Sequence, residues 1–148
     1  MAVVDYQGIL TSLKTILLDD ASLGDVSVFI EEDPQFDLIG AGRALVLTLG
    51  SRREAPGQPL AAGKRTRWHV RLSVWAVGYA ITFEEAAKAR DDLVGLVELV
   101  LMNNRTVNGK VAAGWLEGGE FISVRSQNEG SYALAETVFA AEALAIAT

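Results

Sequence analysis

Apolar and polar residues alternate through the stretch 66–77, and this pattern predicts a long β-strand. Apolar side chains such as Trp68 and Val70 share one face, whereas the other face is charged at its start and apolar at Trp75 and Val77. Because the second face becomes apolar only late, we expect the strand to begin exposed and to end buried on both sides.

A helix is predicted directly after this strand. Thr82 and Glu85 fit a capping box, in which two side chains satisfy backbone N–H groups of the first helical turn, and the helical pattern continues to Met102. Another helix is predicted over Asp5–Leu18, where apolar residues recur at the spacing of a helix packed on a core.

Shorter apolar segments predict further strands. They are Val26–Ile30, Arg43–Leu49 and Phe121–Arg125. Asn108-Gly109 favours a small hairpin over residues 106–111, because this pair suits a type I′ turn, and the glycines around Trp115 indicate a loop.

The C-terminal stretch 132–146 is ambiguous. Its alanine and leucine content favours a helix, whereas its alternating pattern favours a strand. A strand antiparallel to Phe121–Arg125 explains both the alternation and the turn at residues 127–130, so we predict a strand.

Together these elements predict a single α+β domain over residues 1–148. We expect a mostly antiparallel sheet of four to five strands, with two helices packed on one face and a protruding β-hairpin arm at residues 51–65. Pro56 and Pro59 exclude a helix or a central strand within the arm. Loops of this length are uncommon in compact domains and are usually functional or disordered, so the arm is the main candidate for an interaction.

Charge is distributed unevenly along the chain. The net charge is −6, yet basic residues concentrate between Ser51 and Arg71, where Glu54 is the only acidic residue. A basic segment on an acidic chain suggests contact with an acidic protein surface or with phosphate.

The residues that enzymes commonly use are scarce. The chain has no cysteine, which excludes disulfides, thiolate chemistry and cysteine-based zinc sites, and His69 is its only histidine. The Gly-rich stretch 40–45 lacks the third glycine of a nucleotide-binding fingerprint and precedes a strand instead of a helix. We expect no enzyme, no catalytic residue, no cofactor and no metal site. The sequence also shows neither a signal peptide nor an apolar run of the roughly 18 residues that a membrane span needs, so we expect a soluble protein made in a cytoplasm.

The order of these elements resembles the tail-terminator proteins (tail-completion, head–tail joining proteins) of long-tailed bacteriophages. The likeness is carried by the opening helix Ile9–Leu18, the strand Val26–Ile30, the basic Pro/Gly arm leading into residues 67–74, the helix that starts at residues 83–87 and the Ala-rich terminal strand. The likeness spans nearly the whole chain. It concerns the order of the elements, because such proteins share no invariant catalytic motif.

The resemblance implies a structural role without catalysis. Members of that family form a hexameric ring that caps the finished tail tube, ends its polymerisation and joins it to the head connector, while DNA passes through the ring without specific recognition. The resemblance therefore implies a homo-oligomer, a tail tube protein and a head connector as partners, and a place in the tail or neck of a virion assembled in the host bacterial cytoplasm. The interface residues expected on this basis include Arg67 and two charged sets. Arg52, Arg53, Lys64 and Arg65 would meet Glu31, Glu32 and Asp33 of an adjacent chain.

Two other functions stay open at this point. One is a different phage structural part, such as a neck connector or a tail-tube subunit. The other is a nucleic-acid-binding module that uses the basic arm, although the whole chain is acidic and no aromatic residue lies between Ser51 and Arg67.

Overall fold

A computed structural model describes residues 2–31, 42–54, 65–125 and 130–147 of the chain. In chain order the elements are β1 (Ala2–Val3), α1 (Tyr6–Asp19), a 3-10 helix (Ala21–Leu23), β2 (Ser27–Ile30), β3 (Arg43–Glu54), β4 (Arg65–Ala80), α2 (Phe83–Asn103), β5 (Ala113–Gly118), β6 (Phe121–Arg125) and β7 (Ser131–Ala147). The predicted α+β class is confirmed.

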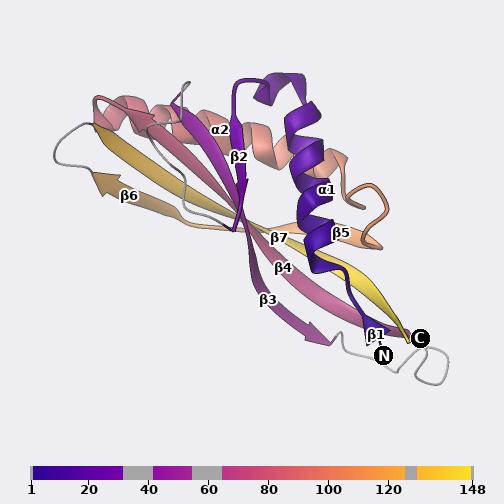
Figure 1. The fold of residues 1–148 in the computed structure, drawn as a ribbon. Coiled ribbons are helices and arrows are strands. Elements are labelled where there is room, and N and C mark those ends of the chain that lie inside the picture. Colours follow the sequence, from indigo (N-terminus) through magenta and orange to yellow (C-terminus); the bar gives the residue numbers. More distant parts are fainter. Residues whose placement is uncertain (1, 32–41, 55–64, 126–129, 148) are drawn as a thin grey trace.

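All seven strands belong to one strongly twisted sheet (Figure 1). Its centre consists of β3, β4 and β7, which are 12, 16 and 17 residues long, and β4 runs antiparallel to both β3 and β7. The short strand β2 pairs parallel with β3 at one edge, and β6, β5 and β1 pair one after another along the far side of β7. The expected mostly antiparallel sheet is confirmed, but the count of four to five strands was too low because this far side is built from three separate short strands.

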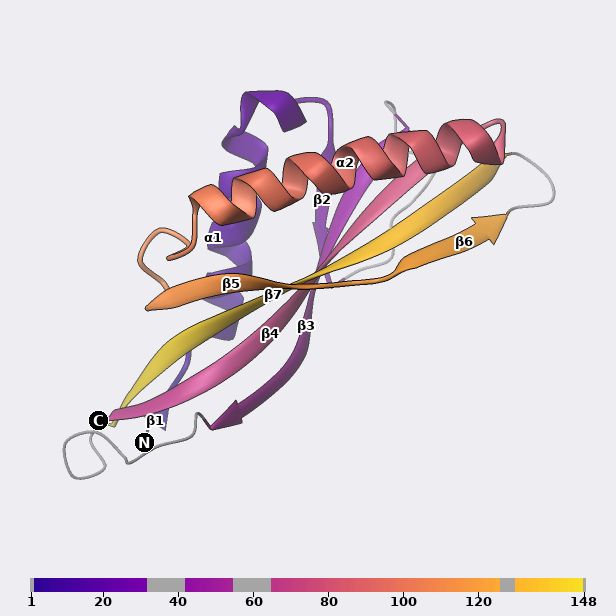
Figure 2. The ribbon, with the colours of Figure 1, turned by 180° about the vertical axis from the view of Figure 1, so that it is seen from behind.

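Both helices pack on the same face of the sheet, which we call the helix face. Figure 2 shows α2 lying along β4 and β7 on this side. The main core lies between the helices and the sheet, and its largest fully buried side chains include Leu13 of α1, Leu93 of α2, Leu72 of β4 and Phe139 of β7. The opposite side, which we call the open face, carries the other set of alternating residues of β4, from Arg67 to Val77, and their cross-strand partners.

The caps and the long strand follow the sequence prediction closely. The Oγ1 atom of Thr82 accepts a hydrogen bond from the backbone N–H of Glu85 at 3.3 Å, as expected of an N-cap, and Asp5 caps α1 through the N–H of Gly8 at 2.9 Å. On the open face of β4, Arg71 is exposed whereas Val77 is 1% exposed, which confirms that the strand ends buried on both sides.

Two predictions were wrong between α2 and β6. Residues 106–111 form a tight turn and not a hairpin, because Val107, Asn108 and Gly109 all have positive φ angles (49°, 56° and 80°) and the Val107 side chain is fully buried. The stretch around Trp115 is strand β5 and not a loop, since it pairs with β7.

The strand predicted at Arg43–Leu49 runs further than expected. A β-bulge between Leu49 and Ser51 lets β3 continue to Glu54 alongside β4. Residues 132–146 form a strand antiparallel to β6, as predicted. Neither helix of the described part is long and apolar enough to cross a membrane.

Candidate interface

The predicted arm starts from a regular β-hairpin. Residues 51–54 belong to β3, and Arg65 opens β4 with its backbone paired to Ile146 of β7. The interior of the arm, residues 55–64 with Lys64, lies outside the described residues, as do Glu32 and Asp33. Figure 1 shows that β3, β4 and β7 extend beyond both helices at this end of the sheet.

Arg52 and Arg53 point to opposite faces of this hairpin, as successive residues of a strand do. Arg52 lies on the helix face, where its guanidinium carbon is 5.9 Å from the ring centre of Tyr6 and 5.2 Å from that of Trp68. Cation–π contacts of this kind tie the base of the arm to α1. The Arg52 guanidinium is therefore already engaged within its own subunit.

Arg53 lies on the open face beside its cross-strand partner His69. It borders a shallow hollow, which is lined by Ser51, Arg53, His69, Arg71, Trp115, Glu117 and Ala140. The edge of the His69 ring meets Trp115 at a centroid distance of 5.6 Å and an interplanar angle of 83°. The described part of the chain offers no ion pair or hydrogen bond to the Arg53 side chain.

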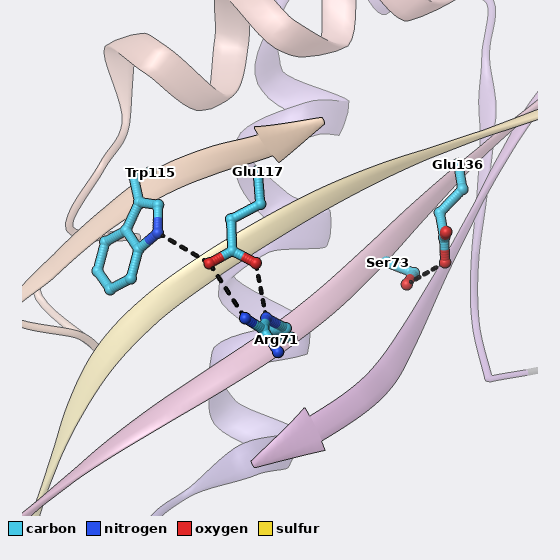
Figure 3. Close-up of polar contacts among 5 residues, drawn as sticks. All are labelled: Arg71, Ser73, Trp115, Glu117 and Glu136. Atoms are coloured by element: carbon cyan, nitrogen blue, oxygen red, sulfur yellow. Dashed lines mark hydrogen bonds and ion pairs between the residues drawn. The ribbon is translucent and has the colours of Figure 1, made fainter. Parts of the chain in front are cut away.

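The strongest contact of the hollow joins Arg71 of β4 to Glu117 of β5 across β7 (Figure 3). The Arg71 Nε atom donates to Oε2 of Glu117 at 2.6 Å and Nη2 donates to Oε1 at 3.5 Å, while the Trp115 Nε1 donates to Oε1 at 3.2 Å. These contacts stabilise the anion, and the hydrogen bond from Arg71 is the main reason why the pKa of Glu117 lies below its ordinary value. Further along the sheet, the Ser73 Oγ donates to Oε2 of Glu136 at 2.7 Å.

Removing the Arg71 guanidinium should raise the lowered pKa of Glu117. In Arg71→Ala we expect the pKa of Glu117 to rise towards the ordinary value of a glutamate. Because the pKa of Glu117 is depressed in the folded protein, the pair stabilises the fold above the unfolded-state pKa, and this contribution disappears as the pH falls through the folded-state pKa. A titration of the carboxyl groups followed by NMR measures the change in the pKa of Glu117. Arg53→Ala is the control, because Arg53 makes no ion pair with Glu117 and is the smallest cause of its lowered pKa. An unchanged Glu117 pKa in Arg71→Ala would contradict this assignment.

The remaining predicted residues of the described part make contacts within the chain. Arg67 approaches Glu142 of β7 at 3.6 Å on the open face, where both side chains are partly exposed. Glu31 has a positive φ of 49°, donates its backbone N–H to the Leu47 carbonyl at 2.8 Å and accepts from the Leu49 N–H through Oε1 at 3.3 Å. Glu31 thus closes part of the outer edge of β3, a role that the sequence did not suggest.

The structure therefore gathers Arg53, Arg67 and Arg71 on the open face and separates Arg52 from them. Trp115 and Glu117 complete the hollow, and sequence reasoning missed them because their strand β5 was assigned to a loop. The alternation in the sequence already placed Arg67, His69 and Arg71 on one face. Within the described ranges no group of three or more His, Cys, Asp or Glu side chains is arranged to hold a metal ion. The arrangement consists of ion pairs and free donors on a sheet surface, which suits contact with another charged surface.

Comparisons with known proteins give structural likenesses but no family. No protein-family model matches the chain, and no curated protein matches it. Among the solved structures, 32 chains match. One of them belongs to a structure described as the virion of a native gene transfer agent particle. It is similar at a TM-score of 0.47 and 14% identity over 90% of this chain and 92% of that chain. At this level the likeness carries no conclusion about function.

Proposed function

We propose that this chain is a structural protein of a long-tailed, phage-like virion. In this role it forms a ring that caps the tail tube, ends the polymerisation of tube subunits and joins the tube to the head connector. The layout of the sequence supports the proposal. One observation from the structure carries it further: the end of the sheet that extends beyond the helices presents the guanidinium of Arg53, which makes no ion pair or hydrogen bond within the described part of its own subunit.

The outer edge of β3 supports a contact at the same end of the molecule. β2 pairs with β3 only along Ala44–Leu47, and Glu31 then covers the edge at Leu49. Beyond this point residues 51–54 border no further strand of the described chain on that side. A free strand edge beside a free positive charge is well suited to contact with a neighbouring subunit or with the tube.

The proposed ring works by shape and by surface contacts. It is a homo-oligomer, most simply a hexamer, with the tail tube protein on one side and the head connector on the other. DNA passes through without sequence recognition, and no bond is made or broken. Apolar area would supply most of the affinity, whereas charge pairs would set the register and the choice of partner.

Charge reversal at the base of the arm tests this role. Arg52→Glu with Arg53→Glu is expected to weaken ring assembly or docking on the tube while the chain stays folded. The two residues are expected to contribute differently, because they lie on opposite faces of the hairpin. Arg53→Glu alone should carry most of the assembly defect, whereas Arg52→Glu should lower the free energy of unfolding by roughly 0.5–2 kcal/mol through loss of the Tyr6 and Trp68 contacts.

The measurement is the distribution of tail lengths on negative-stain images of particles assembled with each variant, together with light scattering of the purified protein. Normal tail lengths with Arg53→Glu would exclude the proposed role of the arm. A wild-type protein that stays monomeric and does not associate with tail tubes would exclude the ring itself.

A further inference from the structure

The hollow on the open face has one positive charge more than it can neutralise. Arg53 and Arg71 both line it, and Glu117 is the one carboxylate among its lining residues. Glu117 is held by Arg71 and by the Trp115 Nε1, so it makes no ion pair with Arg53 and attracts it only weakly from a distance. Ser51 and His69 add hydrogen-bonding groups for which the described chain provides no polar contact. One further carboxylate placed against Arg53 would neutralise the remaining positive charge of the hollow.

The same chain presents carboxylates on the opposite side of the molecule. The outer side of α2 is exposed and carries five of them, which we call the acidic ridge: Glu84, Glu85, Asp91, Asp92 and Glu98. Lys88 is the single basic residue among the exposed positions of this helix. Glu84, Asp91 and Glu98 are seven residues apart, so they form one stripe along the helix, about 10 Å from one to the next. Asp91 is bound to Arg90 at 2.8 Å, which leaves the other four for outside contacts.

We propose that the hollow of one copy binds a carboxylate from the acidic ridge of a second copy. Helix α2, which carries the ridge, lies on the helix face (Figure 2), whereas the hollow lies on the open face, so the two cannot meet within one subunit. Pairing between copies uses two different surfaces and is therefore heterologous, and repeated head-to-tail contacts of this kind close into a ring or continue as a filament. This inference rests on the proposed function for ring closure and adds the contact that would build the ring.

A protein carboxylate fits the hollow better than a nucleic acid does. A duplex presents a phosphate charge about every 1.7 Å of its axis, so it favours a continuous basic surface. The open face instead mixes charges: Glu117 and Glu142 pair with its arginines, and Glu136 lies further along beside Ser73. A run of phosphates along this face would meet these three carboxylates, whereas a single acidic side chain would meet Arg53 alone.

Two charge variants of the full chain test the pairing. Arg53→Glu reverses the free charge of the hollow and keeps the ridge. The second variant combines Glu84→Gln, Glu85→Gln, Asp92→Asn and Glu98→Gln, which neutralises the four free carboxylates of the ridge and keeps the hollow. Each variant alone is expected to self-associate at least about tenfold more weakly than the wild type, as measured by light scattering across a concentration series. Mixed in equal amounts, the two should form 1:1 dimers that grow no further, because each pair retains one intact hollow and one intact ridge. Lys110→Glu and Asp19→Lys are the matched controls, since both residues are exposed and lie outside the two surfaces.

The outcomes separate this inference from the proposed function. Wild-type rings that survive both variants, or a mixture that stays monomeric, would overturn the pairing while leaving the ring proposal intact. A wild-type chain that is monomeric at every concentration would overturn both. Salt-dependent retention of duplex DNA that is lost in Arg53→Glu would assign the hollow to phosphate and overturn the pairing as well.

Discussion

Phe139→Ala is expected to lower the free energy of unfolding by about 3–5 kcal/mol, the usual cost of deleting a buried aromatic side chain. Phe139 is fully buried in β7 and lies between its cross-strand partners Leu72 of β4 and Leu116 of β5. Gly114 packs directly against its ring, because a Cβ atom at this glycine would lie 2.1 Å from Cζ of Phe139. The cavity left by the substitution would therefore open at the point where three strands meet under the helices.

Urea denaturation followed by circular dichroism measures this loss, and Phe121→Ala is the matched control. Phe121 is 65% exposed and contacts the guanidinium of Arg90 at 5.0 Å, so we expect a cost of no more than about 1 kcal/mol. Equal losses at the two positions would show that the core does not centre on Phe139.

Gly78→Val is expected to lower the free energy of unfolding by about 3 kcal/mol, the upper end of the usual range for overpacking. Gly78 lies in β4 directly beneath the first half of α2. A Cβ atom there would lie 2.1 Å from the carbonyl oxygen of Ala86 and 2.8 Å from the backbone nitrogen of Arg90. Both atoms belong to the helix backbone, so α2 itself would have to move away from the sheet.

Gly95→Ala is the control for Gly78→Val, and it should change stability in the opposite direction. Gly95 lies on the exposed side of α2, and a Cβ atom there meets nothing within 4 Å. Alanine in the middle of a helix is favoured over glycine by roughly 0.5–1 kcal/mol, so we expect a gain of this size in the unfolding free energy. A stable Gly78→Val variant with unchanged thermal unfolding would contradict the close contact between β4 and α2.

The parts of the fold that were predictable depend on local pattern. The caps at Asp5 and Thr82 and the alternation of β4 are set by residues close in sequence, and both survive in the structure. The C-terminal strand was also found, because its alternation outweighed the helix propensity of its alanines once it paired with β4 along its whole length.

The two predictions that were wrong concern segments whose structure depends on contacts with distant parts of the chain. The glycines around Trp115 looked like loop residues, but Gly114 is there because the Phe139 ring leaves no room for a side chain. Asn108-Gly109 suits a hairpin turn locally, yet burial of Val107 draws the chain into a different turn. Neither effect is visible before the partner segment is known.

The candidate site also has features that the local sequence predicts and features that depend on distant segments. The sequence identified the basic stretch and the two arginines at the start of the arm, but it treated Arg52 and Arg53 as equivalent. Because β3 continues past the bulge at Gly50, these two neighbours point to opposite faces, and the register of β3 against β4 decides which face each one takes. The pairing of Arg71 with Glu117 spans 46 positions in the sequence and depends on β5, so no local pattern reveals it.

The far border of β7 affects how this chain behaves before it meets a partner. A long, flat edge strand acts as a template on which other molecules add strands and aggregate. Here that border is divided among strands of five, six and two residues, and a bulge between Leu116 and Gly118 interrupts the longest of them. A second molecule pairing along it would lose register within a few residues, so we expect concentrated solutions of the protein to resist fibril growth from this side.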